Sequence, residues 1–272
     1  MNKIFKMNIH NLIKYFRVWK SITLAVAQQQ LLTSWGGLAF VFGKIARFAL
    51  FFIFIASILQ GGVSLAGYSQ AQVITFFLVF NIIDTTAQLL FRGVYMFRNR
   101  VIQGTFDLDL LKPLPSYFRP LFGSTDILDA LLLPPLVIFT FYYTITQQVL
   151  TSTTDFFLFL LMFTNAILVA FSFHLIVIAM GILTTEIDHL VQVYRDLTSI
   201  ARFPTDIYAR SIQFILTFTI PVVILITVPA KSLIGDLTPT LIATSFSISL
   251  IFLFTATRLW KFALSRYTSA SS

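Results

Sequence analysis

Hydrophobic residues gather into six long runs along the chain, and polar residues gather between them. A run of about 17 to 25 mostly apolar residues can cross a hydrocarbon core of roughly 30 Å as a helix. Helical backbone is favoured there because lipid offers no partner to an unpaired backbone group. The pattern therefore predicts an all-α integral membrane protein with six transmembrane helices, at residues 38–59, 72–90, 128–146, 156–180, 212–228 and 241–259.

Three of these runs contain a feature that an ordinary span lacks. The longest uncharged stretch of the first run, residues 48–59, is too short to cross a membrane alone, so Lys44 and Arg47 must reach the membrane surface or face a protein interior. Pro134 and Pro135 interrupt the start of the third run. Pro221 is expected to kink the fifth run, and the short segment 229–240 after it is expected to dip back into the outer membrane face.

Residues 1–35 predict an amphipathic helix and elbow that lie in the membrane interface. Apolar residues recur there at steps of three and four, at Phe5, Ile9, Leu12, Phe16 and Trp19. Basic and polar residues occupy much of the opposite side, at Lys3, Lys6, His10, Lys14 and Arg17. Such a helix buries its apolar face in the bilayer and turns its cations toward anionic headgroups. Two roles stay open, a topological anchor and an elbow that moves during a transport cycle.

Composition supports a membrane protein and excludes several kinds of chemistry. The chain is 57% hydrophobic and 11% charged, far from the balance of a soluble domain. It contains no cysteine, which excludes disulfides and thiolate metal sites. The net charge of +8 follows membrane topology better than it fits a nucleic-acid site. We therefore expect the lipid bilayer as a partner and no nucleic acid.

The distribution of lysine and arginine predicts the orientation. All of them except Lys231 fall in the N-terminal region, the start of the first run, the loops after the second and fourth runs, or the C-terminal end. Because cytoplasmic loops retain such residues, both termini are predicted to be cytoplasmic. The transmembrane domain is then 36–260, with cytoplasmic segments at 92–127 and 181–211 and a cytoplasmic tail at 261–272.

One buried carboxylate is expected to form an ion pair. Asp84 lies eight residues before Arg92, about two helical turns inside the membrane. Lys44 and Arg47 have a similar depth in the first span, so we expect Asp84 to pair with one of them. A structural pair is favoured, and a cation or proton pathway is the alternative. His174 in the fourth span is weak evidence for proton coupling, because an interhelical hydrogen bond can satisfy it.

No short motif for nucleotide binding or catalysis occurs in the chain. Phosphate loops, metalloprotease motifs and nucleophile elbows are all missing from the sequence. Asp107 and Asp109 are expected to be too exposed for a catalytic pair. Glu186, Asp188 and His189 lack a specific metal spacing and are interpreted as a helix cap. We therefore expect no enzyme activity and no cofactor or metal in this chain.

The polar stretch 102–115 is predicted to be a short helix outside the membrane. Gly104 would break the helix before it, the acids at 107 and 109 would favour a new helix start, and Pro113 would close it. A second turn precedes the fifth span, at Arg202, Phe203 and Pro204.

At these residues the chain resembles permease subunits of type-2 ATP-binding-cassette exporters, in a bacterial branch with six spans. The signature G-x-x-D-x-x-L-x-[KR]-P-L is matched by Gly104, Asp107, Leu110, Lys112, Pro113 and Leu114. The turn R-[FY]-P-x-[DE]-I-[FY] is matched at 202–208, L-T-F-x-I-P at 216–221, P-A at 229–230 and the RY-x-S-A tail at 266–270. The matches occur in order along almost the whole chain.

The resemblance implies a fold like that of type V exporters and a complex in which transport and ATP hydrolysis belong to different subunits. Such a permease pairs with a second copy or a sister permease, and two copies of a separate ATPase, which uses ATP and Mg, dock beneath. The resemblance places the docking segment at Gly104, Phe106, Asp107, Asp109, Leu110, Leu111, Lys112, Pro113 and Leu114. It also implies a bacterial plasma (inner) membrane. From the residues alone, an ATP-independent secondary transporter and a non-transporting membrane anchor subunit stay open.

Overall fold

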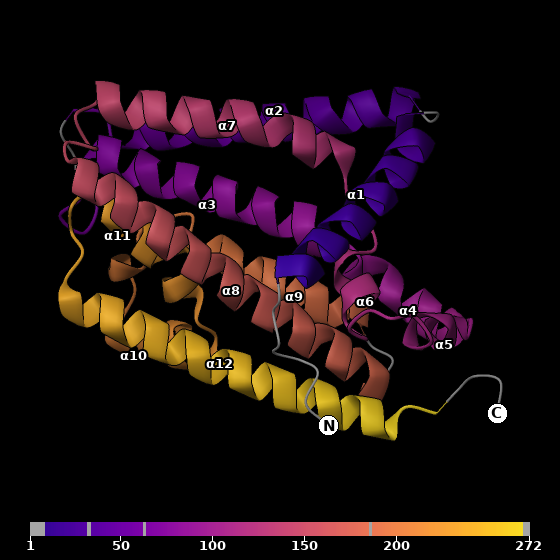
Figure 1. The fold of residues 1–272 in the computed structure, drawn as a ribbon. Helices are drawn as coiled ribbons and strands as arrows, with labels where there is room; N and C mark the ends of the chain where they lie inside the picture. Colours follow the sequence, from indigo (N-terminus) through magenta and orange to yellow (C-terminus); the bar gives the residue numbers. More distant parts are fainter. Residues whose placement is uncertain (1–8, 32–33, 62–63, 185–186, 269–272) are drawn as a thin grey trace.

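The structure, a computed structural model, describes residues 9–31, 34–61, 64–184 and 187–268 (Figure 1). These residues form helices and no strand. Five helices are long and apolar enough to cross a membrane, or six if one bent pair counts as a span. The long helices lie side by side, with the short helices α4 to α6 gathered at one end (Figure 1). We call this the α5 end, and the opposite end, where α3 begins, the Tyr68 end.

Five predicted spans are confirmed as helices. They are α2 (Ser34–Ile58), α3 (Gln70–Phe91), α7 (Ile127–Thr146), α8 (Thr153–Thr184) and α12 (Pro239–Arg266). Helix α3 starts at a capping box in which Ser69 and Gln72 satisfy each other's backbone N–H groups. Helix α7 starts at Asp126, whose side chain accepts a hydrogen bond from the Leu128 N–H. The expected interruption of the third span is wrong, because α7 continues through both prolines.

Helices α3 and α8 form the centre of the molecule and α2 lies at its periphery. Residues 73–80 of α3 are all buried, as is most of the inward side of α8. Helix α2 by contrast exposes large apolar side chains along its length, at Phe42, Ile45, Leu50, Ile53, Phe54 and Ile58. Such a surface needs lipid or another apolar partner.

The fifth predicted span is not one straight helix. It is divided into α10 (Arg210–Phe214), the π-helical turns η2 (Ile215–Thr219) and η3 (Val223–Thr227), and α11 (Val228–Leu233). The two halves are bent by 85°. The break contains Pro221, which has no backbone N–H to donate, and π turns on both sides adjust the hydrogen-bonding pattern.

Contacts of Asp206 show where the chain crosses between the two ends. Helix α9 (Ile187–Ile200) follows α8 at the α5 end, and the short 3-10 turn η1 (Thr205–Ile207) follows α9. In that turn Asp206 pairs with Lys231 at 3.1 Å and accepts a hydrogen bond from Tyr68 at 3.0 Å. The distribution of charge predicts 181–211 on the face opposite Lys231, whereas Asp206, near the end of that segment, lies beside Lys231. Helix α9 makes the crossing, and residues 210–233 turn back from the Tyr68 end.

The α5 end is built from α1 (Ile9–Leu31), α4 (Val94–Ile102), α5 (Thr105–Leu110) and α6 (Phe118–Phe122). Helix α1 runs obliquely across the ends of the long helices (Figure 1). Its Lys14 donates to the Pro113 carbonyl at 2.8 Å, and its Tyr15 ring lies 5.7 Å from that of Phe118. Ile13 and Phe16 are exposed. Lys3, Phe5 and Lys6, which the amphipathic pattern included, lie outside the described residues.

Candidate functional site

The segment predicted to be a short helix forms one, and a glycine sets its direction. Helix α4 ends at Ile102, and Gly104 has a φ of +70° before α5 begins at Thr105. L-residues rarely adopt this left-handed conformation, whereas glycine adopts it without steric cost. The Thr105 hydroxyl donates to the Arg100 carbonyl at 3.3 Å, which holds the corner between the two helices.

The inner face of α5 is anchored by one aromatic side chain. Phe106 is completely buried, with its ring centre 5.0 Å from that of Phe97 in α4 and 5.2 Å from that of Tyr267. Trp260 of α12 lies on the same cluster, at 6.3 Å from Phe106, and donates its indole N–H to Ser116 at 3.0 Å. Burial and the nearby Asp107 raise the pKa of Tyr267 to about 12. A movement of α5 would therefore be transmitted to α4 and α12.

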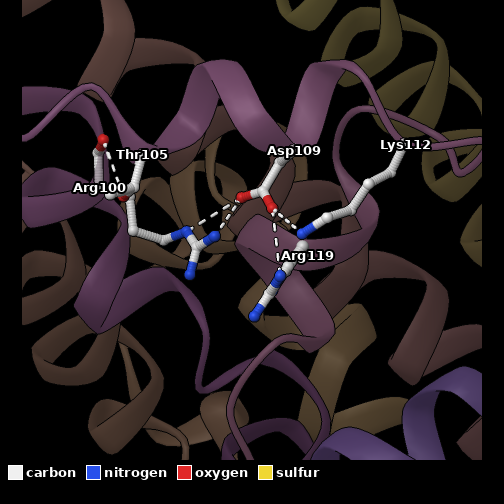
Figure 2. Close-up of polar contacts among 5 residues, drawn as sticks. All are labelled: Arg100, Thr105, Asp109, Lys112 and Arg119. Atoms are coloured by element: carbon white, nitrogen blue, oxygen red, sulfur yellow. Dashed lines mark hydrogen bonds and ion pairs between the residues drawn. The ribbon is translucent and has the colours of Figure 1, made fainter.

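At the end of α5, the carboxylate of Asp109 is surrounded by cationic side chains (Figure 2). Asp109 is only 4% exposed and accepts hydrogen bonds from Arg100, whose Nε lies 3.1 Å away. Lys112 at 3.0 Å and Arg119 at 3.5 Å face its second oxygen. The expectation that Asp109 is exposed is thus wrong. Its burial could not be predicted from the sequence, because the guanidinium of Arg119 arrives from beyond Pro113.

Three leucines in and directly after α5 are exposed in the described part of the chain. Leu108 is 61% exposed, Leu110 40% and Leu111 82%. Ile102 at the end of α4 is also exposed. These four residues, named here the α5 patch, lie beyond the ends of the long helices, beside the cations that surround Asp109. Large exposed apolar side chains that gather in one short segment outside the spans mark a candidate interaction site.

A cavity lies between the spans, away from α5. It has a volume of about 280 Å³ and is bounded by α2, α3, α7 and the turn after α9. Charged and amide side chains line part of its wall, at Lys44, Arg47, Asn81, Asp84, Gln88 and Arg202. Five aromatic rings line another part, at Phe48, Phe51, Phe77, Phe80 and Phe139, and α7 adds the aliphatic side chains of Leu132, Pro135 and Leu136.

The ion pairs beside the cavity differ from the expected one. Lys44 pairs with Asp129 of α7, a fully buried residue, and not with Asp84. Arg92 lies 3.0 Å from Asp126 and 3.7 Å from Asp129. Asp84 accepts a hydrogen bond from Gln88 at 2.7 Å and faces the cavity that Lys44 and Arg47 also line. The carboxylate that pairs with Lys44 comes from the third span, α7, and not from the second.

The predicted turn before the fifth span lies against α2 and α3. The Arg202 guanidinium is 5.3 Å from the Phe51 ring centre and 5.2 Å from that of Phe80. The Phe203 ring lies 5.9 Å from that of Phe51, and Pro204 is buried. This turn is thus part of the cavity wall.

The remaining polar candidates have local roles or lie outside the described part of the chain. His174 is buried, and its Nδ1 forms a hydrogen bond at 2.7 Å with the Ala170 carbonyl of its own helix. Of the residues interpreted as a helix cap, Glu186 is not described. Among the described residues, no group of three histidines or acids is placed to hold a metal ion.

Comparison with known proteins gives one match. The model of a family described as ABC-2 family transporter protein matches residues 45–271, which include α3 to α12 and most of α2. Neither the curated proteins nor the solved structures gave a match. The matched region contains both the α5 patch and the cavity.

Proposed function

The chain belongs to the ABC-2 family of transporter proteins, and from this premise we propose that it is the permease subunit of an ATP-driven exporter. Family and fold make it a multi-pass membrane protein of a transport system. In the proposed complex it pairs with a second copy or a sister permease to form the translocation pathway. ATP and Mg are used by two copies of a separate ATPase subunit.

The α5 patch carries this proposal. Its leucines lie beyond the spans, and the segment that bears them is held rigidly by Phe106 inside and Asp109 beside it. A rigid, exposed, apolar surface can transmit force from a partner, whereas a flexible loop would absorb it. Phe106 connects that surface to α12, and the Gly104 corner connects it to α4 and α3. We propose that the ATPase docks here and that its closure moves the spans between inward-open and outward-open states.

The basic residues support an orientation with the α5 end in the cytoplasm. Lys14, Arg98, Arg100, Lys112 and Arg119 all belong to α1 or to the segment from α4 to α6. The positive-inside rule then places both termini and the α5 patch on the cytoplasmic side of a bacterial plasma membrane. This is also the side on which ATP is available to a partner subunit.

A single charge in the α5 patch tests the proposal. Leu111→Asp changes a side chain that is 82% exposed, so insertion and folding should be preserved. An unpaired carboxylate in an apolar interface costs several kcal/mol. Since about 1.4 kcal/mol corresponds to a tenfold change in affinity, we expect the amount of cognate ATPase that co-purifies from membranes to fall by roughly tenfold or more.

Leu111→Met is the matched control, because it keeps an apolar side chain of similar size at the same position. It should co-purify with the ATPase as the wild-type chain does. Normal recovery of the ATPase with Leu111→Asp, or export that proceeds without ATP, would contradict the proposal.

A further inference from the structure

The cavity between α2, α3 and α7 has a charge imbalance that its own residues do not remove. Lys44 is paired with Asp129, which leaves Arg47 and Arg202 facing the single carboxylate of Asp84. In the described part of the chain neither arginine has a carboxylate within ion-pair distance. Uncompensated cations beside apolar spans are costly and are found where a ligand or pathway uses them. The cavity therefore favours an anion.

Arg202 is held at the cavity wall by rings instead of by an acid. Its guanidinium lies over both Phe51 and Phe80, at 5.3 and 5.2 Å from their centres. Stacking of this kind fixes the plane of a guanidinium while leaving its N–H donors available at the edge. Those donors match the oxygens of a carboxylate or phosphate group.

Polar and apolar parts of the wall are separated along the membrane axis. On α3 the apolar lining residues come first from the Tyr68 end, at Phe77 and Phe80, and the polar ones follow, at Asn81, Asp84, Thr85 and Gln88. Helix α2 runs the opposite way and gives the same order, because Lys44 and Arg47 precede Phe48 and Phe51. A ligand in this cavity would meet Lys44, Arg47 and Asp84 toward the α5 end and aromatic rings toward the Tyr68 end, with Arg202 lying over two of those rings, Phe51 and Phe80.

From this separation we infer that the cavity binds a single-chain amphiphile with an anionic headgroup, oriented with its headgroup at Arg47 and its apolar body among the phenylalanine rings. Its volume of about 280 Å³ is at the lower end of the roughly 300 to 1,000 Å³ typical of small-molecule sites. That volume favours one apolar chain over a diacyl lipid. The inference deepens the proposed function, since it names a substrate class for the permease.

Binding to the chain alone tests this inference without involving the ATPase. The purified protein in phosphatidylcholine nanodiscs would be titrated with a dansyl-labelled undecanoate, whose fluorescence rises in an apolar site. We expect saturable binding that dodecyl phosphate displaces and that dodecanol and dodecyltrimethylammonium do not. Non-saturable signal, or equal displacement by all three competitors, would indicate partition into the bilayer and overturn the inference. Either result leaves the co-purification test of the α5 patch unaffected.

Variants assign the binding to the cavity. Arg47→Gln and Arg202→Gln should each weaken binding about tenfold, the size expected for one lost charge-assisted contact. Asp84→Asn should strengthen binding, a gain that a misfolded protein would not show. Arg258→Gln is the matched control, because Arg258 also lies over a phenylalanine, at 4.9 Å from the Phe254 ring centre, but is on α12 and does not line the cavity. Equal loss in Arg258→Gln, or no change in the two cavity variants, would overturn the assignment.

A final arm separates an exported amphiphile from a membrane lipid. Titrations in nanodiscs that contain phosphatidylglycerol should give the same affinity, since the inferred ligand has one apolar chain and a diacyl lipid has two. Loss of probe binding in those nanodiscs would assign the site to anionic phospholipid and contradict the inference.

Discussion

Asp109 stabilises the shape of the segment that bears the α5 patch through a single carboxylate. It neutralises part of a cluster of three cations that are each between 23% and 37% exposed. Without it Arg100, Lys112 and Arg119 would repel one another across the base of α5. The surrounding residues suit this role, because Phe106 covers one side of the segment and leaves Asp109 almost no contact with water.

Replacing Asp109 should loosen the segment without unfolding the spans. Removal of one partner of a buried pair costs roughly 3 to 5 kcal/mol, and the partial exposure of the cations reduces this to about 1 to 3 kcal/mol. In Asp109→Asn we therefore expect faster tryptic cleavage after Arg98 and Arg100, measured by mass spectrometry of the fragments. The bonds after Lys112 and Arg119 precede proline and should stay resistant. Asp196→Asn changes an exposed carboxylate of α9 and should leave cleavage after Arg98 and Arg100 at the wild-type rate.

At the scale of elements, the corner between α4 and α5 depends on one residue. Gly104 has a φ of +70°, and a side chain there costs about 1 kcal/mol in backbone strain. Gly104→Ala should relieve the strain by changing the angle between the helices, which displaces the α5 patch. We expect normal insertion and a several-fold loss of transport-coupled ATP hydrolysis in the reconstituted complex.

Gly43→Ala is the control for this change. Gly43 lies within α2, and a Cβ atom added there meets no atom within 4 Å. Transport-coupled hydrolysis should be unchanged. Equal losses in the two variants would mean that the Gly104 result reflects glycine replacement in general.

The elements that the sequence predicts well are those whose signal is local. The apolar runs predict five of the spans, four of them to within about four residues at each end, whereas α12 continues to Arg266, seven residues beyond the predicted end. Gly104 and Pro113 predict the short helix α5. Residues 187–233 are harder to predict, because α9 is short and amphipathic and its position depends on distant contacts such as that of Asp206 with Lys231. The partner of Lys44 is hard to predict for the same reason, since Asp129 comes from a third helix.

In the whole molecule, the two candidate sites lie at different positions along the length of the spans. The α5 patch lies beyond one end of the spans, and the cavity lies among α2, α3 and α7. Helix α3 connects them, because it lines the cavity and leads through Gly93 into α4. A larger residue at Gly93 would force the backbone to shift, since an added Cβ would lie 2.6 Å from the Pro120 carbonyl oxygen. This close packing joins α3 to the segment that bears the α5 patch, as the proposed ATP-driven permease requires.

Site-directed cross-linking to the ATPase tests the central claim most directly. The chain has no cysteine, so Leu111→Cys and Ile207→Cys each introduce one thiol for a benzophenone maleimide. Both side chains are exposed, at opposite ends of the molecule in the structure. In the complex with its cognate ATPase, photolysis should cross-link position 111 to the nucleotide-binding subunit and leave position 207 free of it. Absence of the cross-link at 111, or equal cross-linking from 207, would contradict the account.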